Sequence, residues 1–193
     1  MTRKAPRVIA ASLLLGLLVP WEVHAQTSAD YSDTAGDWNI VGFVIGKGNT
    51  IACKMQKSAA DGSPFAYLSM ISTGGNGIDV KALFVFKTEF PEGSSPNVSL
   101  SFDREKQKGL IGGVNGGYLH IDLTARGTDE LKRLVDLLQS SGALTETASL
   151  KGHPDETVMV DLGDSDTAFD KNGICMRAVM GMGAARMQQN SDQ

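Results

Sequence analysis

The sequence predicts an α+β fold, in which an antiparallel β-sheet or sandwich is followed by two strand-helix units. Between residues 37 and 123, short runs of alternating apolar and polar residues are separated by turns rich in Gly, Asn and Pro. This pattern is typical of antiparallel strands. After residue 124 the apolar spacing becomes that of a helix, returns once to alternation, and then becomes helical again.

The predicted sheet begins with a hairpin. Residues 38–45 form an apolar run that ends at a Gly/Asn loop, and residues 50–57 then alternate. Two such runs joined by this kind of loop indicate a β-hairpin. Further strands are expected over residues 65–72, 79–88, 98–102 and 110–123, with a charged turn over residues 103–108.

The two helices have separate start signals. Thr128 can cap a helix in which leucines recur at helical spacing until Gly142 ends it. Residues 157–162 alternate as one more strand, and Ser165 or Asp166 can cap a short second helix. The Met-, Gly- and Gln-rich residues 181–193 are expected to form a flexible tail.

Residues 1–25 have the pattern of a secretory signal peptide. A basic start is followed by an apolar run over residues 8–19, and cleavage is expected between Ala25 and Gln26. The alternative is an uncleaved anchor, but an apolar run of 12 residues is short for a bilayer. We therefore expect a soluble protein of the periplasm or a secreted protein, which does not span a membrane after cleavage.

The composition of the chain is that of a globular protein without a nucleic-acid partner. With 41% apolar and 21% charged residues, the 193-residue chain has the composition of a globular protein. The net charge of -4 does not indicate a nucleic-acid partner, because proteins that bind nucleic acid typically carry an excess of positive charge. We expect a flexible arm over residues 26–36 and a single globular domain over residues 37–180.

Cys53 and Cys175 are the two cysteines of the chain. An even number of cysteines in an exported chain favours a disulfide bond between them. The alternatives are two buried thiols that do not meet and a catalytic thiol. A catalytic thiol requires a second cysteine at Cys-x-x-Cys spacing or a neighbouring base, and neither is visible.

No catalytic, cofactor-binding or metal-binding residue can be assigned from the motifs. Beyond the signal peptide the histidines are His120 and His153, which are not spaced as metal ligands, and no Gly-x-Ser-x-Gly sequence is present. The aspartates between Asp161 and Asp170 resemble a calcium loop loosely, but turn and helix capping explain them better. Met176, Met180 and Met187 could form a stripe on one helix face and bind copper, although methionine more commonly fills gaps in a core.

Trp38 is the only tryptophan beyond the signal peptide and begins an apolar run. A large aromatic residue in this context is expected to pack in the core. The alternative is an interaction site, in which an exposed indole stacks on a sugar or a peptide.

Three short motifs carry a resemblance to a known family. They are Gly36-Asp37-Trp38, Cys53-Lys54-Met55-Gln56, and a segment that runs from Leu162 through Phe169 to Cys175. Together they resemble the invasion-associated locus B family of small exported alphaproteobacterial proteins. Gly42 departs from the family pattern, which often has a cysteine at this point. The resemblance implies a β-rich, non-enzymatic envelope protein, linked in some members to host-cell invasion.

The function expected from the sequence is therefore that of an exported, non-catalytic envelope or periplasmic protein. It would act by interaction with an envelope or host protein. One alternative is a periplasmic module that binds a small ligand or a metal through residues 161–170 or the Met-rich tail. A second alternative is a hydrolase whose catalytic residues are scattered along the chain.

Overall fold

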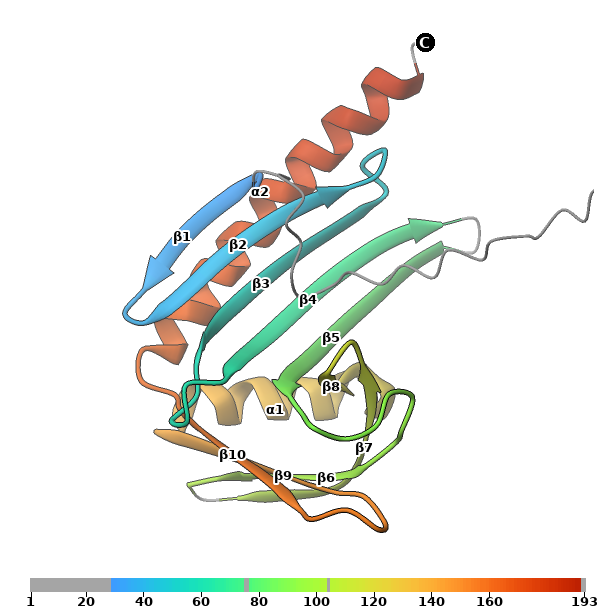
Figure 1. Ribbon diagram of the computed structural model, residues 1–193. Helices are drawn as coiled ribbons and strands as arrows, with labels where there is room; N and C mark the ends of the chain where they lie inside the picture. The colour runs from blue at the N-terminus through green and yellow to red at the C-terminus, as the bar shows by residue number, and fades with distance from the viewer. Residues whose placement is uncertain (1–28, 75–76, 104, 192–193) are drawn as a thin grey trace, which may run out of the picture.

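Ten antiparallel strands and two α-helices make up the computed structural model, which describes residues 29–74, 77–103 and 105–191 (Figure 1). The strands pair in the order β1-β2-β3-β4-β5-β8-β7-β6-β9-β10. The predicted signal peptide and its cleavage site at Ala25 and Gln26 lie outside the described residues. The elements are β1 (Tyr31–Ala35), β2 (Trp38–Ile45), β3 (Thr50–Ser58), β4 (Pro64–Gly74), β5 (Gly77–Lys87), β6 (Asn97–Phe102), β7 (Lys106–Asn115), β8 (Tyr118–Asp122), the 3₁₀-helix η1 (Thr124–Arg126), α1 (Thr128–Ser140), β9 (Ala143–Ser149), β10 (Glu156–Asp161) and α2 (Ser165–Ser191).

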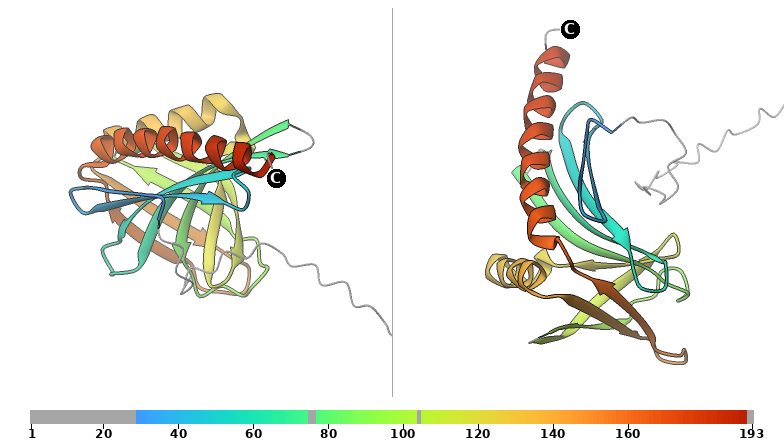
Figure 2. Two further views of the ribbon diagram at one scale, coloured as in Figure 1. Left: turned by 90° about the horizontal axis from the view of Figure 1, so that it is seen from above. Right: turned by 90° about the vertical axis from the view of Figure 1, so that its left-hand side faces the viewer.

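The sheet bends strongly, so that β1–β5 form one half and β6, β7, β9 and β10 form the other (Figures 1 and 2). Helix α2 packs on β1, β2 and β3, and α1 lies beside the start of α2, between the two halves. Alternate residues of every strand point into the space between the halves, and these residues form one hydrophobic cluster. The antiparallel sheet and the two helices agree with the predicted α+β class.

Trp38 lies inside this cluster, with 1% of its surface exposed. Its ring meets Phe65 edge-on at 5.9 Å between centroids, and Phe65 in turn contacts Phe86 at 5.0 Å. The indole N–H donates a hydrogen bond to the Gly163 carbonyl oxygen at 2.8 Å, just before α2 begins. The buried ring therefore leaves no exposed face on which a sugar or a peptide could stack.

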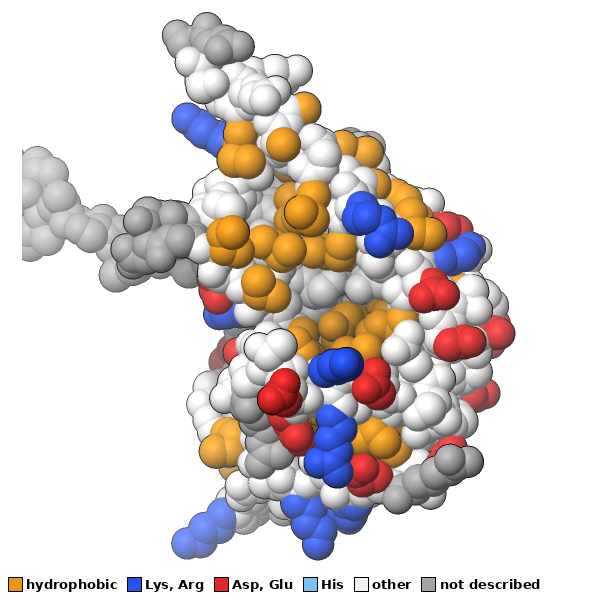
Figure 3. Space-filling view, turned by 180° about the vertical axis from the view of Figure 1, so that it is seen from behind, with side chains coloured by type: hydrophobic (Ala, Val, Ile, Leu, Met, Phe, Trp, Pro, Cys, Tyr) orange, Lys and Arg blue, Asp and Glu red, His pale blue; other side chains and the backbone are white. Residues whose placement is uncertain are grey.

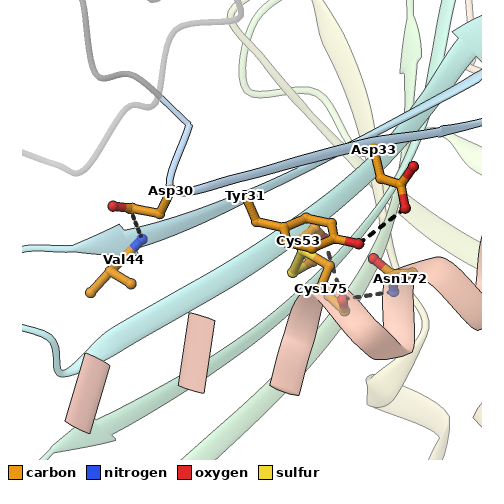
Figure 4. The surroundings of a disulfide bond; sticks show 8 residues. Asp30, Tyr31, Asp33, Val44, Cys53, Asn172 and Cys175 are labelled. Carbon is orange, nitrogen blue, oxygen red and sulfur yellow. Dashed lines mark hydrogen bonds between the residues drawn. A yellow bond between two sulfur atoms is a disulfide. The ribbon is translucent and has the colours of Figure 1, made fainter. Parts of the chain in front are cut away.

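The disulfide bond between Cys53 and Cys175 joins β3 to α2, as the sequence predicts (Figure 4). The two Cα atoms lie 6.2 Å apart. Gly42 of β2 pairs with Cys53 and lies directly under the helix. A Cβ atom at Gly42 would come within 2.6 Å of the Cys175 sulfur and 2.7 Å of a Val179 methyl carbon, so glycine permits the close approach of α2.

The two ends of the described chain hold each other in place. The Arg186 guanidinium pairs with the Asp30 carboxylate and donates to the Val44 carbonyl oxygen at 2.8 Å. Asp30 also accepts a hydrogen bond from the Val44 amide at 2.7 Å. These contacts explain two differences from the sequence-based expectation. Residues 181–191 continue α2 in place of the expected flexible tail, and residues 31–35 of the expected arm form β1.

Strand β9, like β1, is an element that the sequence analysis missed. Its inward-facing positions are Leu144, Glu146 and Ala148, and the glutamate in the middle conceals the alternation. The segment over residues 103–108 also differs from the expected turn, because β7 begins at Lys106.

Candidate interaction surface

Helix α2 has one buried stripe and two flanks. The buried stripe contains Cys175 and Val179 and lies on β2 and β3. The flank toward β4 is identified by two contacts. The Asn172 amide donates to the Ser69 hydroxyl at 3.2 Å, and the Phe169 ring lies 4.9 Å from that of Tyr67. Helical spacing places the methionines of α2 at 176, 180 and 187 on the same flank as Phe169.

Beside this flank, the distal half of the β4–β5 hairpin presents apolar residues. Ile71 follows Tyr67 and Ser69 on the α2 side of β4 and pairs with Val80 of β5. Val80 is 52% exposed and Ile78 is 74% exposed, because α2 covers β1–β3 and stops short of β5. We call this region the α2/β5 apolar surface, and it consists of Ile71, Ile78, Val80, Met176, Met180 and Met187.

Hydrophobic side chains gather on this face of the molecule (Figure 3). They spread over α2 and the neighbouring strands around a hollow, whereas Lys, Arg, Asp and Glu side chains lie mostly beside and below them. Met180, in the middle of the helical flank, is 50% exposed. A contiguous exposed apolar patch is typical of a site for protein binding, and flexible methionines adapt to the shape of a partner.

The opposite flank of α2 is polar and is occupied by β1. The Lys171 ammonium group lies 2.9 Å from an Asp33 carboxylate oxygen, and the Tyr31 hydroxyl donates to the other oxygen at 3.2 Å (Figure 4). The hydrogen bond from Lys171 is the main cause that lowers the pKa of Asp33. Ile174, 45% exposed, and Met182, 39% exposed, are the large apolar residues on this side of the helix.

Glu146 is a buried carboxyl group that the sequence analysis did not identify. It is 1% exposed, and its Oε1 atom has no hydrogen-bond partner among the described residues. Its cross-strand neighbours in the sheet are Leu100 of β6 and Val158 of β10. Burial and the neighbouring charge of Glu156 raise its pKa to about 8.

The residues considered for catalysis or metal binding are distributed over separate elements. His120 lies on β8, where burial lowers its pKa, and His153 lies in the β9–β10 turn, where it meets Phe90 edge-on at 6.1 Å. Asp161 accepts a hydrogen bond from the Gly163 amide at 2.8 Å, and Asp166 accepts one from the Thr167 amide at 2.7 Å. Within the described ranges, no three His, Cys, Asp or Glu side chains are grouped so that they could hold a metal ion.

A polar cleft of about 480 Å³ lies on another part of the surface, between the β3–β4 turn, the end of β5 and the start of β10. Glu156 is its most enclosed acid. Its two carboxylate oxygens already accept hydrogen bonds from the Thr88 hydroxyl at 2.6 Å and the Glu89 amide at 2.9 Å. This carboxylate therefore fastens β10 to the end of β5.

Among the helices of the described residues, none is both long enough and apolar enough to cross a bilayer.

Comparison with known proteins gives one structural neighbour. No protein-family model matches the chain, and no curated protein matches it. The chain is similar to invasion associated protein B from Bartonella henselae, whose crystal structure is known, with 18% sequence identity and a TM-score of 0.48. The similarity covers 76% of this chain and 99% of that protein.

Proposed function

We propose that this chain is an exported, non-catalytic protein of the bacterial envelope, and that it binds another protein through the α2/β5 apolar surface. The observation that carries the proposal is the exposure of Val80 and Met180, which belong to different elements on the face of the sheet that α2 covers in part. Leaving such apolar groups in water is unfavourable, and burial against a partner removes this cost.

Two further observations support export. The first 25 residues have the pattern of a signal peptide. The disulfide bond between Cys53 and Cys175 is of the kind that persists in oxidising compartments. The motifs around Trp38 and Cys53 resemble those of the invasion-associated locus B family. On the basis of this resemblance we extend the proposal to a partner on a host cell. A deletion strain that enters host cells as efficiently as the parent would contradict this extension.

The proposal can be tested by site-specific photo-crosslinking in intact cells of the source organism. A photoreactive amino acid at Met180 is expected to give a crosslinked product of defined mass, which mass spectrometry can identify. The matched control is the same amino acid at Ile174, a similarly exposed apolar position on the opposite flank of α2. Equal crosslinking at both positions, or none at Met180, would contradict the proposal.

Substitutions at the same two positions provide an independent measurement. Met180→Glu places a charge on the apolar surface and should weaken binding of the crosslinked partner by at least tenfold. Ile174→Glu should leave that binding within twofold of the wild type. Both positions are about half exposed, so neither substitution should lower the melting temperature appreciably.

A further inference from the structure

Strand β5 has a free edge over part of its length. On one side it pairs with β4 from Gly77 to Phe86, but on the other side it pairs with β8 only from Leu83 to Lys87. Among the described residues, no strand pairs with residues 78–82 on that second side. This open stretch lies next to the α2/β5 apolar surface.

The backbone groups at this edge can be assigned from hydrogen bonds farther along β5. The Leu123 amide donates to the Ala82 carbonyl oxygen at 2.9 Å, and the Thr88 amide donates to the Gly117 carbonyl oxygen at 3.1 Å. Backbone groups of alternate residues point to the same side of a strand. The N–H and C=O groups of Ile78 and Val80 therefore point to the free edge, ready to pair with an added strand.

The side chains along this stretch define a pattern for the added strand. Ile78 and Val80 lie on the α2 side and are exposed, whereas Asp79 and Lys81 lie exposed on the other side. An added strand would bring apolar residues beside Ile78 and Val80. On its other face, a basic residue opposite Asp79 and an acidic residue opposite Lys81 would complement the charges.

The two ends of the sheet differ from this edge. The outer strand β1 presents mostly polar residues, with Ser32, Asp33 and Thr34 at its centre. At the other end, the Met159 carbonyl oxygen of β10 already accepts a hydrogen bond from the Ala60 amide at 2.8 Å. The open stretch of β5 therefore combines free backbone groups with exposed apolar side chains.

We propose that the partner contributes an extended segment of its chain, which adds as an antiparallel strand to β5 at Ile78–Lys81. This inference rests on the proposed function and names the form of the partner at that surface. The segment would alternate apolar and charged residues, and its apolar side chains would extend the α2/β5 apolar surface. Strand addition supplies main-chain hydrogen bonds for affinity, and the alternate side chains supply specificity.

A second copy of this chain fits the edge less well. Pairing two β5 strands so that Asp79 of each lies opposite Lys81 of the other places Ile78 of the second copy opposite Ala82. Leu123 already occupies that place through its hydrogen bond to Ala82. Shifting the register by one pair to avoid Leu123 places the two Asp79 carboxylates opposite each other, which is unfavourable. A segment of a different protein is not subject to this conflict.

The test uses a synthetic peptide, Glu-Val-Lys-Val-Ser, with a free N-terminus and a label at its C-terminus, so that its first residue lies opposite Lys81 and the peptide ends before the place of Leu123. In antiparallel pairing its two valines lie opposite Val80 and Ile78, and their N–H groups face β5. N-methylation of both valines should therefore reduce binding to the mature protein at least tenfold. The matched control is N-methylation of the Glu and Lys residues, whose N–H groups face away, and this should change binding less than twofold.

The complementary variant is Val80→Pro, which removes a backbone N–H that points to the free edge and not to β4. It should abolish peptide binding, while Val80→Thr retains the N–H and should retain part of the binding. An unchanged melting temperature checks that Val80→Pro is folded. Absence of peptide binding at millimolar concentration, equal effects of the two methylation patterns, or dimerisation through β5 would each overturn the inference. Continued crosslinking at Met180 would show that the proposed function survives such a failure.

Discussion

A Cβ atom at Gly42 would lie 2.6 Å from the sulfur of Cys175, although 133 residues separate the two positions in the sequence. This contact determines how closely α2 can approach β2. The distance is shorter than real Cβ contacts, so any larger residue at position 42 must push the helix and the disulfide bond outward.

Gly42→Ala is therefore expected to lower the free energy of unfolding by about 1–3 kcal/mol through overpacking. Chemical denaturation followed by circular dichroism measures this change. Gly181→Ala is the matched control, because its Cβ atom would meet none of the described side chains and alanine favours a helix by about 1 kcal/mol. A Gly42→Ala protein as stable as the wild type would show that α2 can shift without cost.

Loss of the disulfide bond should destabilise the protein by about 2–5 kcal/mol, because the bond closes a loop across 122 positions. Cys53→Ser and Cys175→Ser should lower the melting temperature by similar amounts. The double variant should cost little more than either single variant, since each change removes the same bond. Additive effects in the double variant would mean that the two cysteines stabilise the fold independently.

Stability should fall with rising pH because of Glu146. Its pKa is raised from 4.5 to about 8, so the folded protein retains a proton that the unfolded chain loses above about pH 4.5. Between about pH 4.5 and 8, this group should reduce the free energy of unfolding by up to about 1.4 kcal/mol per pH unit.

Glu146→Gln removes this titration, so the difference in unfolding free energy between the variant and the wild type isolates the contribution of Glu146. The variant should be the more stable protein at pH 8, and its advantage should shrink toward pH 4.5. Urea denaturation at a series of pH values measures both. A difference that does not vary with pH would show that Glu146 is ionised in the folded state.

Trp38→Ala should destabilise the protein by about 3–5 kcal/mol, because it opens a cavity beside Phe65 and removes the hydrogen bond to Gly163. The fluorescence of the mature wild-type protein should be blue-shifted and resist quenching by iodide, since Trp38 is its only tryptophan once the signal peptide is removed. Strong iodide quenching in the folded protein would contradict the burial of the indole.

Local patterns predicted the parts of the fold that depend on local chemistry. The hairpin that contains Cys53 follows from turn residues and alternation, and α1 follows from the helical spacing of its leucines; both were predicted correctly. The predicted cap at Thr128 was wrong, because Gly127 is the N-cap residue and no side chain caps the helix. The cysteine count predicted the disulfide bond with Cys175, because two cysteines allow only one pairing within the chain. The burial of Trp38 followed from its size and from its place at the start of an apolar run.

The remaining features depend on contacts between distant segments. The full length of α2 depends on Arg186 reaching Asp30 and Val44, which no local pattern indicates. The α2/β5 apolar surface requires knowledge of which strands α2 covers. The free edge at Val80 depends on where β8 ends relative to β5, and the sequence of neither strand contains that information.

The bond between Cys53 and Cys175 also imposes an order in time. A chain is synthesised from its N-terminus, so Cys53 exists as a lone thiol until 122 further positions have been added. Over that interval the first three strands lack the helix that covers them, and their apolar face is open. A thiol-reactive label should therefore mark Cys53 in nascent or truncated chains and leave the finished, exported protein unlabelled, so that the presence of the disulfide bond reports both completed synthesis and export.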